Sequence, residues 1–323
     1  MSEIKKILVV RLSSLGDIIL SFPLLNILKK KFPKSEIHFL TGKKFHEIVR
    51  LNKNADKVIE LNDEIRITRN EIGKNNYDLI LDIHKNFRSI YLTAFNGREV
   101  RRYQKGNLKK FLLVKFRISL FDEIIPVYKK YLLTLKDILN EEETEFTAGG
   151  LQPDGNDKFN FKYTVIAPSS RHFTKTYPAE KFTEFILSRP DEVFILTGSS
   201  EETDMKICGS IAVKCKNTFN LCGKLSLKEL AEVVNGSEYV ISNDSAVLHL
   251  SEALKKKTIG IFGSTVREFG FFPQLSSSEV LEVKGLKCRP CSHIGRPECP
   301  EGHFRCMMET DLKELRYRPE NNN

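Results

Sequence analysis

The sequence predicts an α/β protein made of two similar units with parallel sheets that face each other across a cleft. Strand-like apolar runs alternate with helical ones along both halves of the chain, which is typical of parallel α/β architecture. A polar stretch at 141–160, rich in Gly, Asp and Glu, separates the halves and is typical of a linker. With 323 residues the chain is long enough for two domains, which we place at 1–150 and 151–323.

The alternation gives the expected elements in order. The expected strands are Lys5–Val10, Glu36–Thr41, Lys57–Glu60, Leu79–Ile83 and Glu99–Arg102 in the first half, and Tyr163–Ala167, Glu192–Thr197, Thr218–Leu221, Tyr239–Ser242 and Thr258–Phe262 in the second. Helices are expected between them, notably over Leu15–Phe32. Open parallel sheets bind ligands at the carboxyl ends of their strands, so the segments that follow strands are the candidate sites.

Composition is that of a soluble globular protein, with 41% apolar and 29% charged residues. The first apolar run is short and ends at Arg11, so it does not read as a signal peptide. No uncharged apolar stretch approaches the roughly 18 residues that a spanning helix needs. We therefore expect a cytoplasmic protein.

The net charge of +9 is concentrated between residues 98 and 117. Apolar residues are interleaved there with basic ones, a combination that suits an anionic, partly lipidic surface. We therefore expect contact with such a surface; the alternative is a solvated helix face over an ordinary core. Nucleic acid fits the charge alone, but no nucleic-acid-binding motif accompanies it. The basic residues are Arg98, Arg101, Arg102, Lys105, Lys109, Lys110, Lys115 and Arg117.

The first strand-to-helix turn reads RLSSLGD and ends in the carboxylate of Asp17. A nucleotide-dependent oxidoreductase would want G-x-G-x-x-G at this place, and a turn with the single glycine Gly16 counts strongly against that class. An aspartate here would also repel a phosphate.

Three strand ends of the second half carry the parts of a phosphate site. Ser169, Ser170 and Lys175 supply hydroxyls and a cation, which fit a metal-free diphosphate site or, alternatively, a capped loop with a solvent lysine. Glu201 and Glu202 stand where carboxylates take ribose hydroxyls, although helix caps are the more common reading. Asp244 and Ser245 cap a helix or aim it at a phosphate. No D-x-D pair for a divalent metal occurs in the chain.

Four of the seven cysteines form the cluster C-x2-C-x7-C-x6-C from Cys288 to Cys306. In a cytoplasmic chain such a cluster favours a metal over disulfides, and four thiolates suit zinc or iron. The spacing is not that of a standard zinc ribbon, so a redox-labile or purely structural cysteine segment is the alternative. The four candidate ligands are Cys288, Cys291, Cys299 and Cys306.

Taken together, four motifs resemble glycosyltransferase family nine, the bacterial heptosyltransferases of lipopolysaccharide core assembly. They are RLSSLGDIILSFP near the N-terminus, KTYP at 175–178, SNDSAVLHL at 242–250 and IFGST at 261–265. The cysteine-rich tail resembles the heptosyltransferase II branch in particular. Three positions depart from the common family pattern: Tyr177 replaces a tryptophan, Ser245-Ala246 replaces Thr-Gly, and Ser264 stands where a proline is frequent.

The resemblance implies a GT-B fold of two Rossmann-like domains and an inverting glycosyltransferase that needs no metal for transfer. It places the donor, ADP-heptose, in the C-terminal domain and an anionic glycolipid of the lipid A–core type in the N-terminal domain. It implies Asp17 as catalytic base and, for an enzyme with a lipid-linked acceptor, peripheral contact with the cytoplasmic face of the inner membrane. The donor contacts that follow are Ser169, Ser170, Lys175, Glu201, Glu202, Asp244, Ser245 and Ala246, and the acceptor contacts are Ser13, Ser14, Gly16, Arg101, Arg102 and Lys105.

Two alternatives remain open. A family-nine transferase with another nucleotide-sugar or acceptor would carry the same motifs. A metal-held nucleotide-binding interaction protein without transferase activity would explain the cysteine cluster, but not the ordered motifs at the strand ends.

Overall fold

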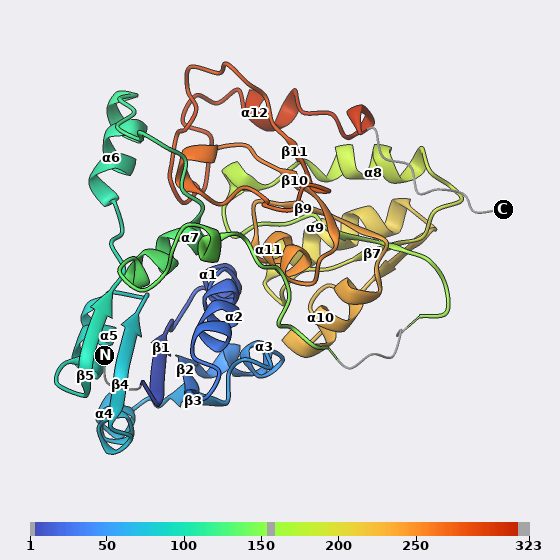
Figure 1. Cartoon of the computed structure of the whole chain (residues 1–323). Coiled ribbons are helices and arrows are strands. Elements are labelled where there is room, and N and C mark those ends of the chain that lie inside the picture. Colours follow the sequence, from blue (N-terminus) through green and yellow to red (C-terminus); the bar gives the residue numbers. More distant parts are fainter. Residues whose placement is uncertain (1–3, 154–158, 316–323) are drawn as a thin grey trace. The chain divides into compact units, whose positions relative to one another are not determined.

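The structure, a computed structural model, describes residues 4–153 and 159–315 of the chain. Its described residues form two compact units, one of residues 4–106 and 125–153, the other of residues 107–124 and 159–315. Each unit contains one parallel sheet, as Figure 1 shows in blue to teal for the first and in green to orange for the second. The predicted α/β class is confirmed.

The sheet of the first unit has the strand order β3-β2-β1-β4-β5 and is parallel throughout. Its central strand pairs on both sides, with Val9 opposite Phe39 on one and Leu81 on the other. The chain order reverses between β1 and β4, which is the place where open parallel sheets bind ligands. The strands are β1 Lys6–Val10, β2 Glu36–Gly42, β3 Lys57–Leu61, β4 Tyr77–Asp82 and β5 Gly97–Arg102.

Helices of the first unit pack in two groups, α4 against α5 and α2 against α7. The right-handed crossovers of a parallel sheet place such groups on its faces. The elements are α1 Leu15–Ile19, α2 Phe22–Lys31, α3 His46–Arg50, α4 Ile65–Lys74, α5 Phe87–Thr93 and α7 Val127–Leu132, with short 3₁₀ turns at η1 Lys43–Phe45, η2 Leu133–Leu135 and η3 Glu142–Thr144.

The single helix expected over 15–32 is wrong, because the segment forms two helices with a break at Leu20–Ser21. The Ser21 hydroxyl donates 2.6 Å to the carbonyl of Ile18, and Pro23 occupies the first turn of α2. A proline is accepted in a first turn, where its missing N–H costs nothing.

The sheet of the second unit has the order β11-β10-β9-β6-β7-β8, again all parallel, and reverses between β6 and β9. Every strand expected from the sequence has a counterpart whose ends differ by at most two residues. The edge strand β11 was not expected. The strands are β6 Thr164–Ala167, β7 Phe194–Leu196, β8 Thr218–Asn220, β9 Tyr239–Asn243, β10 Lys257–Ile261 and β11 Glu279–Leu281.

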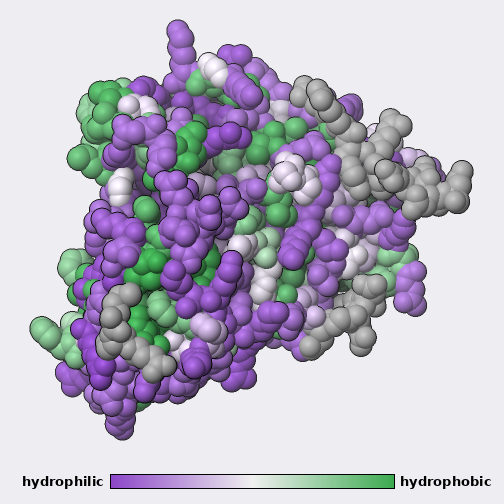
Figure 2. Space-filling model, in the orientation of Figure 1, coloured by the Kyte–Doolittle hydropathy of each residue, from purple (hydrophilic) through white to green (hydrophobic). Residues whose placement is uncertain are grey.

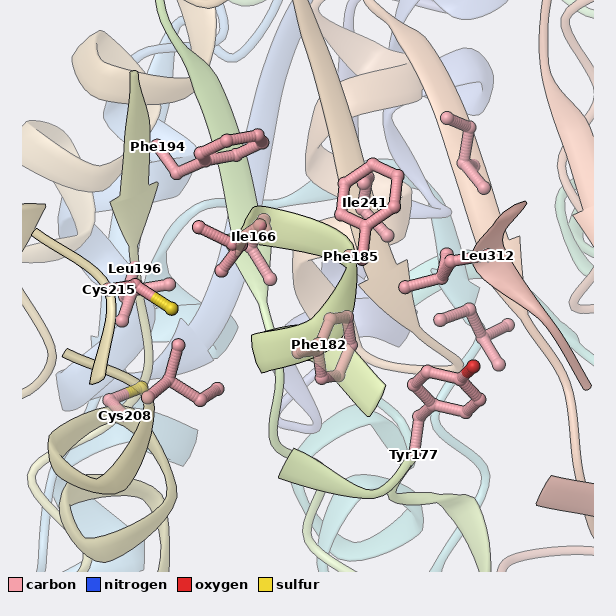
Figure 3. Close-up of a cluster of buried hydrophobic side chains, with 14 of the residues drawn as sticks. Ile166, Tyr177, Phe182, Phe185, Phe194, Leu196, Cys208, Cys215, Ile241 and Leu312 are labelled. Carbon is pink, nitrogen blue, oxygen red and sulfur yellow. The ribbon is translucent and has the colours of Figure 1, made fainter. Parts of the chain in front are cut away.

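The core of the second unit lies between its sheet and the helices that cover it. Figure 3 shows Phe182 and Phe185 of α8 pointing toward Ile166 on β6 and Ile241 on β9. Burial of such side chains stabilises the fold by about 2 kcal/mol each. The helices and turns are α6 Asn107–Phe116, η4 Phe173–Lys175, α8 Ala179–Leu187, α9 Glu202–Lys214, α10 Leu227–Gly236, α11 Ala246–Ala253, η5 Arg267–Phe269, α12 Arg305–Met308 and η6 Leu312–Glu314.

The segment 107–124 belongs to the second unit, whereas the expected boundary at 150/151 left it in the first domain. Its attachment is polar: the Arg117 guanidinium donates to the backbone carbonyls of Lys287, Cys288 and Pro290. None of the helices in the described ranges is both long and apolar enough to cross a membrane.

Candidate active-site residues in the two units

Asp17 lies in the first turn of α1, directly after the end of β1. The Ser14 hydroxyl donates a hydrogen bond of 2.7 Å to Asp17 Oδ2, and the Ser14 amide lies 3.4 Å from the same oxygen. A carboxylate three residues after a serine cap is a favourable arrangement at a helix start. The local sequence thus fixes the position of the carboxylate at the carboxyl end of β1.

Two further residues that the sequence analysis did not single out hold this carboxylate. Arg11 is buried, and its guanidinium lies 2.7 Å from Asp17 Oδ2 while also donating 2.7 Å to the carbonyl of Ile83. The Tyr131 hydroxyl donates 3.2 Å to Asp17 Oδ1. Arg11 was detectable as a charged residue at a strand end. Tyr131 carries no local signal, because it meets Asp17 only through the fold.

The surroundings decide the charge of Asp17. Burial alone would raise its pKa, but the Arg11 guanidinium and the hydrogen bonds from Ser14 outweigh burial and lower the pKa below its ordinary value. The carboxyl is therefore ionised throughout the neutral range and can accept a proton.

A cavity of about 570 Å³ opens at the carboxyl ends of β1, β2 and β4. Ser13 lines it and is the chain neighbour of Ser14, which holds Asp17. His84 also lines it; burial foremost, and then the charge of Arg11, lowers the His84 pKa to about 4, so the imidazole is neutral near pH 7. The lining residues are Leu12, Ser13, Gly42, Lys44, Phe45, Leu61, His84, Asn86, Phe87 and Arg88.

Of the predicted acceptor contacts, Ser13 and Ser14 lie at this site, and Gly16 lies inside α1 beside Asp17. Lys105 is close enough to Arg11 and Asp82 for their charges to act on its pKa, which burial foremost lowers. Arg101 is bound by Glu99 and Asp137, and Arg102 pairs with the buried Asp82 at 3.6 Å. The acceptor roles of these residues stay predictions.

In the second unit, several of the predicted donor residues meet where the chain order reverses between β6 and β9. Lys175 Nζ lies 2.7 Å from Asp244 Oδ2, and the Thr265 hydroxyl donates 2.7 Å to the same oxygen. Both charged side chains are largely buried. A buried ion pair of this kind places the ammonium rigidly, which is what recognition of a fixed anion requires.

Asn243 holds the two loops of this site together. Its side-chain Nδ2 donates a hydrogen bond of 2.8 Å to the carbonyl of Pro168, and its Oδ1 accepts one of 3.1 Å from the backbone amide of Tyr177. This links the loop after β6, with Ser169 and Ser170, to the loop before α11. The remaining predicted donor contacts in the second loop are Ser245, which caps α11, and Ala246, which begins it.

Glu201 and Glu202 lie at a different turn, at the start of α9. Both are exposed, and Glu202 pairs with Lys206 one helical turn away at 2.6 Å. No hydrogen bond or ion pair among the described residues joins either glutamate to Lys175 or Asp244. Their role toward a nucleotide stays a prediction.

All four cysteines of the 288–306 cluster border one small cavity of about 20 Å³, together with His303. The chain has no disulfide among these residues. Within residues 4–153 and 159–315, no group of three or more His, Cys, Asp or Glu side chains is arranged to hold a metal ion. The thiols therefore surround a common space without closing on one point.

The cysteine segment also supports the loop that carries Lys175. The amide of Arg296 donates 2.8 Å to the Thr174 hydroxyl, and the amide of Thr174 donates 3.2 Å to the Arg296 carbonyl. Phe173 stacks on Phe304 with ring centroids 4.6 Å apart. The segment thus fixes the 3₁₀ turn η4 from one side.

Comparison with solved structures gives the fold class of the chain. Over 94% of this chain and 98% of the other, the structure resembles that of Escherichia coli ADP-heptose LPS heptosyltransferase II, with a TM-score of 0.71 at 18% identity. The iron-containing dodecameric glycosyltransferase TibC of enterotoxigenic E. coli matches over 95% of this chain and 73% of its own, with a TM-score of 0.61 at 11% identity. The fold is that of a GT-B glycosyltransferase.

The sequence narrows this class to one family. Residues 65–300 match the model of glycosyltransferase family 9 (heptosyltransferase), and the chain belongs to this family. The lipopolysaccharide heptosyltransferase 1 of Campylobacter coli is 27% identical over 289 residues, which cover 80% of this chain and 84% of the relative. The resemblance inferred from the motifs is confirmed.

Proposed function

We propose that the chain transfers heptose from ADP-heptose to the inner core of lipopolysaccharide, on an acceptor of the lipid A–Kdo–heptose type, with inversion and without a catalytic metal. The observation that carries the proposal is the pair of strand-end sites, one with an ionised carboxylate and one with a rigidly held cation. Glycosyl transfer from a nucleoside diphosphate sugar to a hydroxyl needs both functions: a base for the hydroxyl and a cation for the departing diphosphate.

Asp17 supplies the base. A sugar hydroxyl is a poor nucleophile, so a carboxylate must take its proton while the glycosidic bond forms. Asp17 is ionised because Arg11 and Ser14 stabilise its charge. Ser13, the chain neighbour of Ser14, lines a cavity that is large enough for a sugar ring. Attack opposite the departing nucleotide inverts the anomeric centre.

Lys175 neutralises the charge that develops on the diphosphate as it leaves. An incoming phosphate competes with Asp244 for the ammonium, and Ser169, Ser170, Ser245 and the first amides of α11 supply further donors. With this set no divalent cation is needed. Glu201 and Glu202 would take the ribose hydroxyls, a role that rests on the family resemblance alone.

The cysteine cluster is proposed as a structural zinc or iron site. Four soft thiols around one cavity are a suitable donor set for either metal, and binding would draw them inward. Because the cysteine segment packs against η4, such a metal would stiffen the Lys175 loop and would take no part in the chemistry.

Contact with the inner membrane is assigned to the segment 107–124. Large apolar side chains at positions 108, 111, 116, 118, 120 and 124 are about half exposed or more, and Lys109, Lys110 and Lys115 are interleaved with them. Figure 2 shows the hydrophobic residues gathered over α6 at the upper left. Of the residues of α6, Leu113 alone is buried, so a solvated face over an ordinary core is the weaker description.

A thermal-shift panel tests the donor assignment. ADP and ADP-heptose should raise the unfolding midpoint by several degrees at saturating concentration, because about 100 Kd of ligand adds about 2.7 kcal/mol. UDP and NAD should not. Elemental analysis of the same preparation, next to a Cys288→Ser variant, tests the metal. A shift with UDP-sugars alone would assign the chain to another donor.

A further inference from the structure

The loop after β10 contacts Asp244 with a side chain and the turn of Lys175 with its backbone. The Thr265 hydroxyl donates 2.7 Å to Asp244 Oδ2, the oxygen that also binds Lys175 Nζ. One residue earlier, the amide of Ser264 donates 3.2 Å to the carbonyl of Thr174, which precedes Lys175. Ser264, Thr265 and Asp244 are each at most 3% exposed. The position of this loop therefore decides how the carboxylate and the ammonium are held.

The guanidinium of Arg289 fixes this loop in turn. Its Nε and Nη2 donate 3.1 Å and 2.7 Å to the carbonyl of Thr265, and its Nη1 donates 2.8 Å to the carbonyl of Val283. Glu282 lies 2.6 Å from Nη2, and the Arg289 side chain is only 7% exposed. A planar guanidinium with several fixed acceptors holds a carbonyl in one place, whereas a lysine ammonium lacks this forked geometry.

The contacts form one continuous chain that ends at the ammonium of Lys175. Arg289 holds the carbonyl of Thr265, the hydroxyl of Thr265 holds Asp244, and Asp244 holds Lys175. A lysine side chain is flexible, so a ligand that has to order it loses binding free energy. A site in which the lysine is ordered in advance avoids this loss.

We propose that Arg289 is a positioning residue that presents Lys175 to the diphosphate of the donor and acts through Thr265 and Asp244. This role deepens the proposed function, on which it rests for the contact between Lys175 and the donor. It differs from the support that Arg296 gives to the Lys175 turn, because Arg289 acts on the carboxylate partner of the lysine and not on the turn itself.

Chemical labelling of Lys175 tests this role without any nucleotide. Acetic anhydride acylates accessible amines, and mass spectrometry of peptides measures the rate at each lysine. The Lys175 side chain is 15% exposed and ion-paired, so it should react slowly in the wild type. Arg289→Met and Thr265→Val should each raise this rate several-fold, because Asp244 is then held less firmly. Lys181, which donates 2.8 Å to the carbonyl of Thr310, is the internal control and should keep its rate.

Calorimetric titration of the full-length chain with ADP measures the consequence for donor binding. Arg289→Met and Thr265→Val should each raise the Kd for ADP about tenfold, as expected when a charge-assisted contact is weakened. In a Lys175→Met background neither change should raise the Kd further, because both act through that lysine. Arg305→Met is the matched control, since Arg305 is an exposed arginine near the same cysteines that pairs with Glu309.

Thr265→Val keeps the shape of the side chain and lies outside the cysteine cluster. It therefore tests the chain of contacts even where Arg289→Met does not fold or changes the metal content, which the unfolding midpoint and elemental analysis report. Unchanged labelling of Lys175 together with an unchanged Kd for ADP in the folded variants overturns the proposal. A tenfold loss that persists in the Lys175→Met background also overturns it, because Arg289 would then support the fold in general.

A transfer assay separates this positioning role from the proposed function. In an active enzyme, Arg289→Met and Thr265→Val should raise the KM for ADP-heptose about tenfold and leave the acceptor KM unchanged. If labelling and ADP binding change as expected but the wild type transfers no heptose, the proposed function fails and the positioning role stands. If transfer occurs and the KM for ADP-heptose changes in neither variant, the positioning role fails and the function stands.

Discussion

At the scale of single residues, the two oxygens of Asp17 are not equivalent. Oδ2 accepts from Arg11 and from the Ser14 hydroxyl, both at 2.7 Å, whereas Oδ1 accepts the longer 3.2 Å bond from Tyr131. A carboxylate oxygen has capacity for about two strong hydrogen bonds. Oδ1 is therefore the oxygen with room for a substrate hydroxyl, and Tyr131 and Arg11 are positioning residues that orient it.

Replacing Arg11 should change the pH dependence of transfer. A base works only when ionised, so activity is lost as the pH falls through the pKa of Asp17. In the wild type that loss should come below about pH 4, because the pKa is lowered from the ordinary aspartate value. Arg11→Met removes the cation and should move the acidic limb of kcat/KM to higher pH.

Arg11→Lys is the control, since it keeps the charge and should keep the limb near its wild-type position. Circular dichroism and the unfolding midpoint at neutral pH show whether each variant is folded, which matters because Arg11 is buried. The same pairing stabilises the fold above the ordinary aspartate pKa, and this contribution is lost in acid. Identical limbs in the wild type and in Arg11→Met would show that Arg11 does not set the charge of Asp17.

Asp17 was accessible from the sequence, because a motif surrounds it at a recognisable place after the first strand. Of its two partners, Arg11 carried a signal as a charged residue at a strand end, whereas Tyr131 carried none. Arg11 is six residues away, and its contact depends on how the Ser13–Ser14 turn folds back, while Tyr131 is 114 residues away. Contacts across such distances are set by tertiary packing, which no local pattern encodes.

At the scale of elements, the strand positions followed from the apolar runs because buried parallel strands read as continuous hydrophobic stretches. The edge strand β11 was missed for the converse reason: it has three residues, all of them half-buried. The single helix expected over 15–32 was wrong. The apolar periodicity of the sequence continues across Ser21, but the helix is interrupted there, where the Ser21 hydroxyl donates to the carbonyl of Ile18.

Helix α6 shows that the sequence also predicted the extent of a surface segment only in part. The sequence analysis treated residues 98–117 as one basic, partly apolar surface. The structure divides these residues between the two units. Arg101 and Arg102 are used in ion pairs of the first unit, and the exposed apolar side chains belong to α6 and the residues after it. The proposed membrane contact is thus narrower than the stretch that predicted it.

A double change in α6 should weaken binding to anionic lipid vesicles. Phe111 and Phe116 lie against each other, with centroids 6.0 Å apart, and are each more than half exposed. Replacing both by serine should lower the partition coefficient on phosphatidylglycerol vesicles at least about tenfold, because two aromatic side chains no longer leave water on binding. Sedimentation with vesicles measures this.

Leu187→Ser is the matched control, since Leu187 is a comparably exposed apolar residue at the end of α8. It should leave the partition coefficient unchanged, and pure phosphatidylcholine vesicles should bind every variant weakly. Equal binding by the wild type and the double variant would show that α6 is an ordinary solvated helix and does not contact the membrane.

At the scale of the whole molecule, each unit places some of its predicted residues where the order of its parallel strands reverses. In the first unit this is the β1–β4 end with Asp17, and in the second it is the β6–β9 end with Lys175 and Asp244. The sequence predicted both ends, because motifs at strand ends are local. It did not predict that the cysteine segment supports the Lys175 loop, since that contact joins residues about 120 positions apart.

The measurement that tests the central claim most directly is heptose transfer by the wild type and by Asp17→Asn under the same conditions. Mass spectrometry of the acceptor glycolipid should show one added heptosyl residue with ADP-heptose and wild-type enzyme. Asp17→Asn should lower kcat by about 10²–10⁴-fold while keeping the thermal shift caused by ADP, because the base is lost and the donor site is intact. Near wild-type turnover in Asp17→Asn would contradict the account.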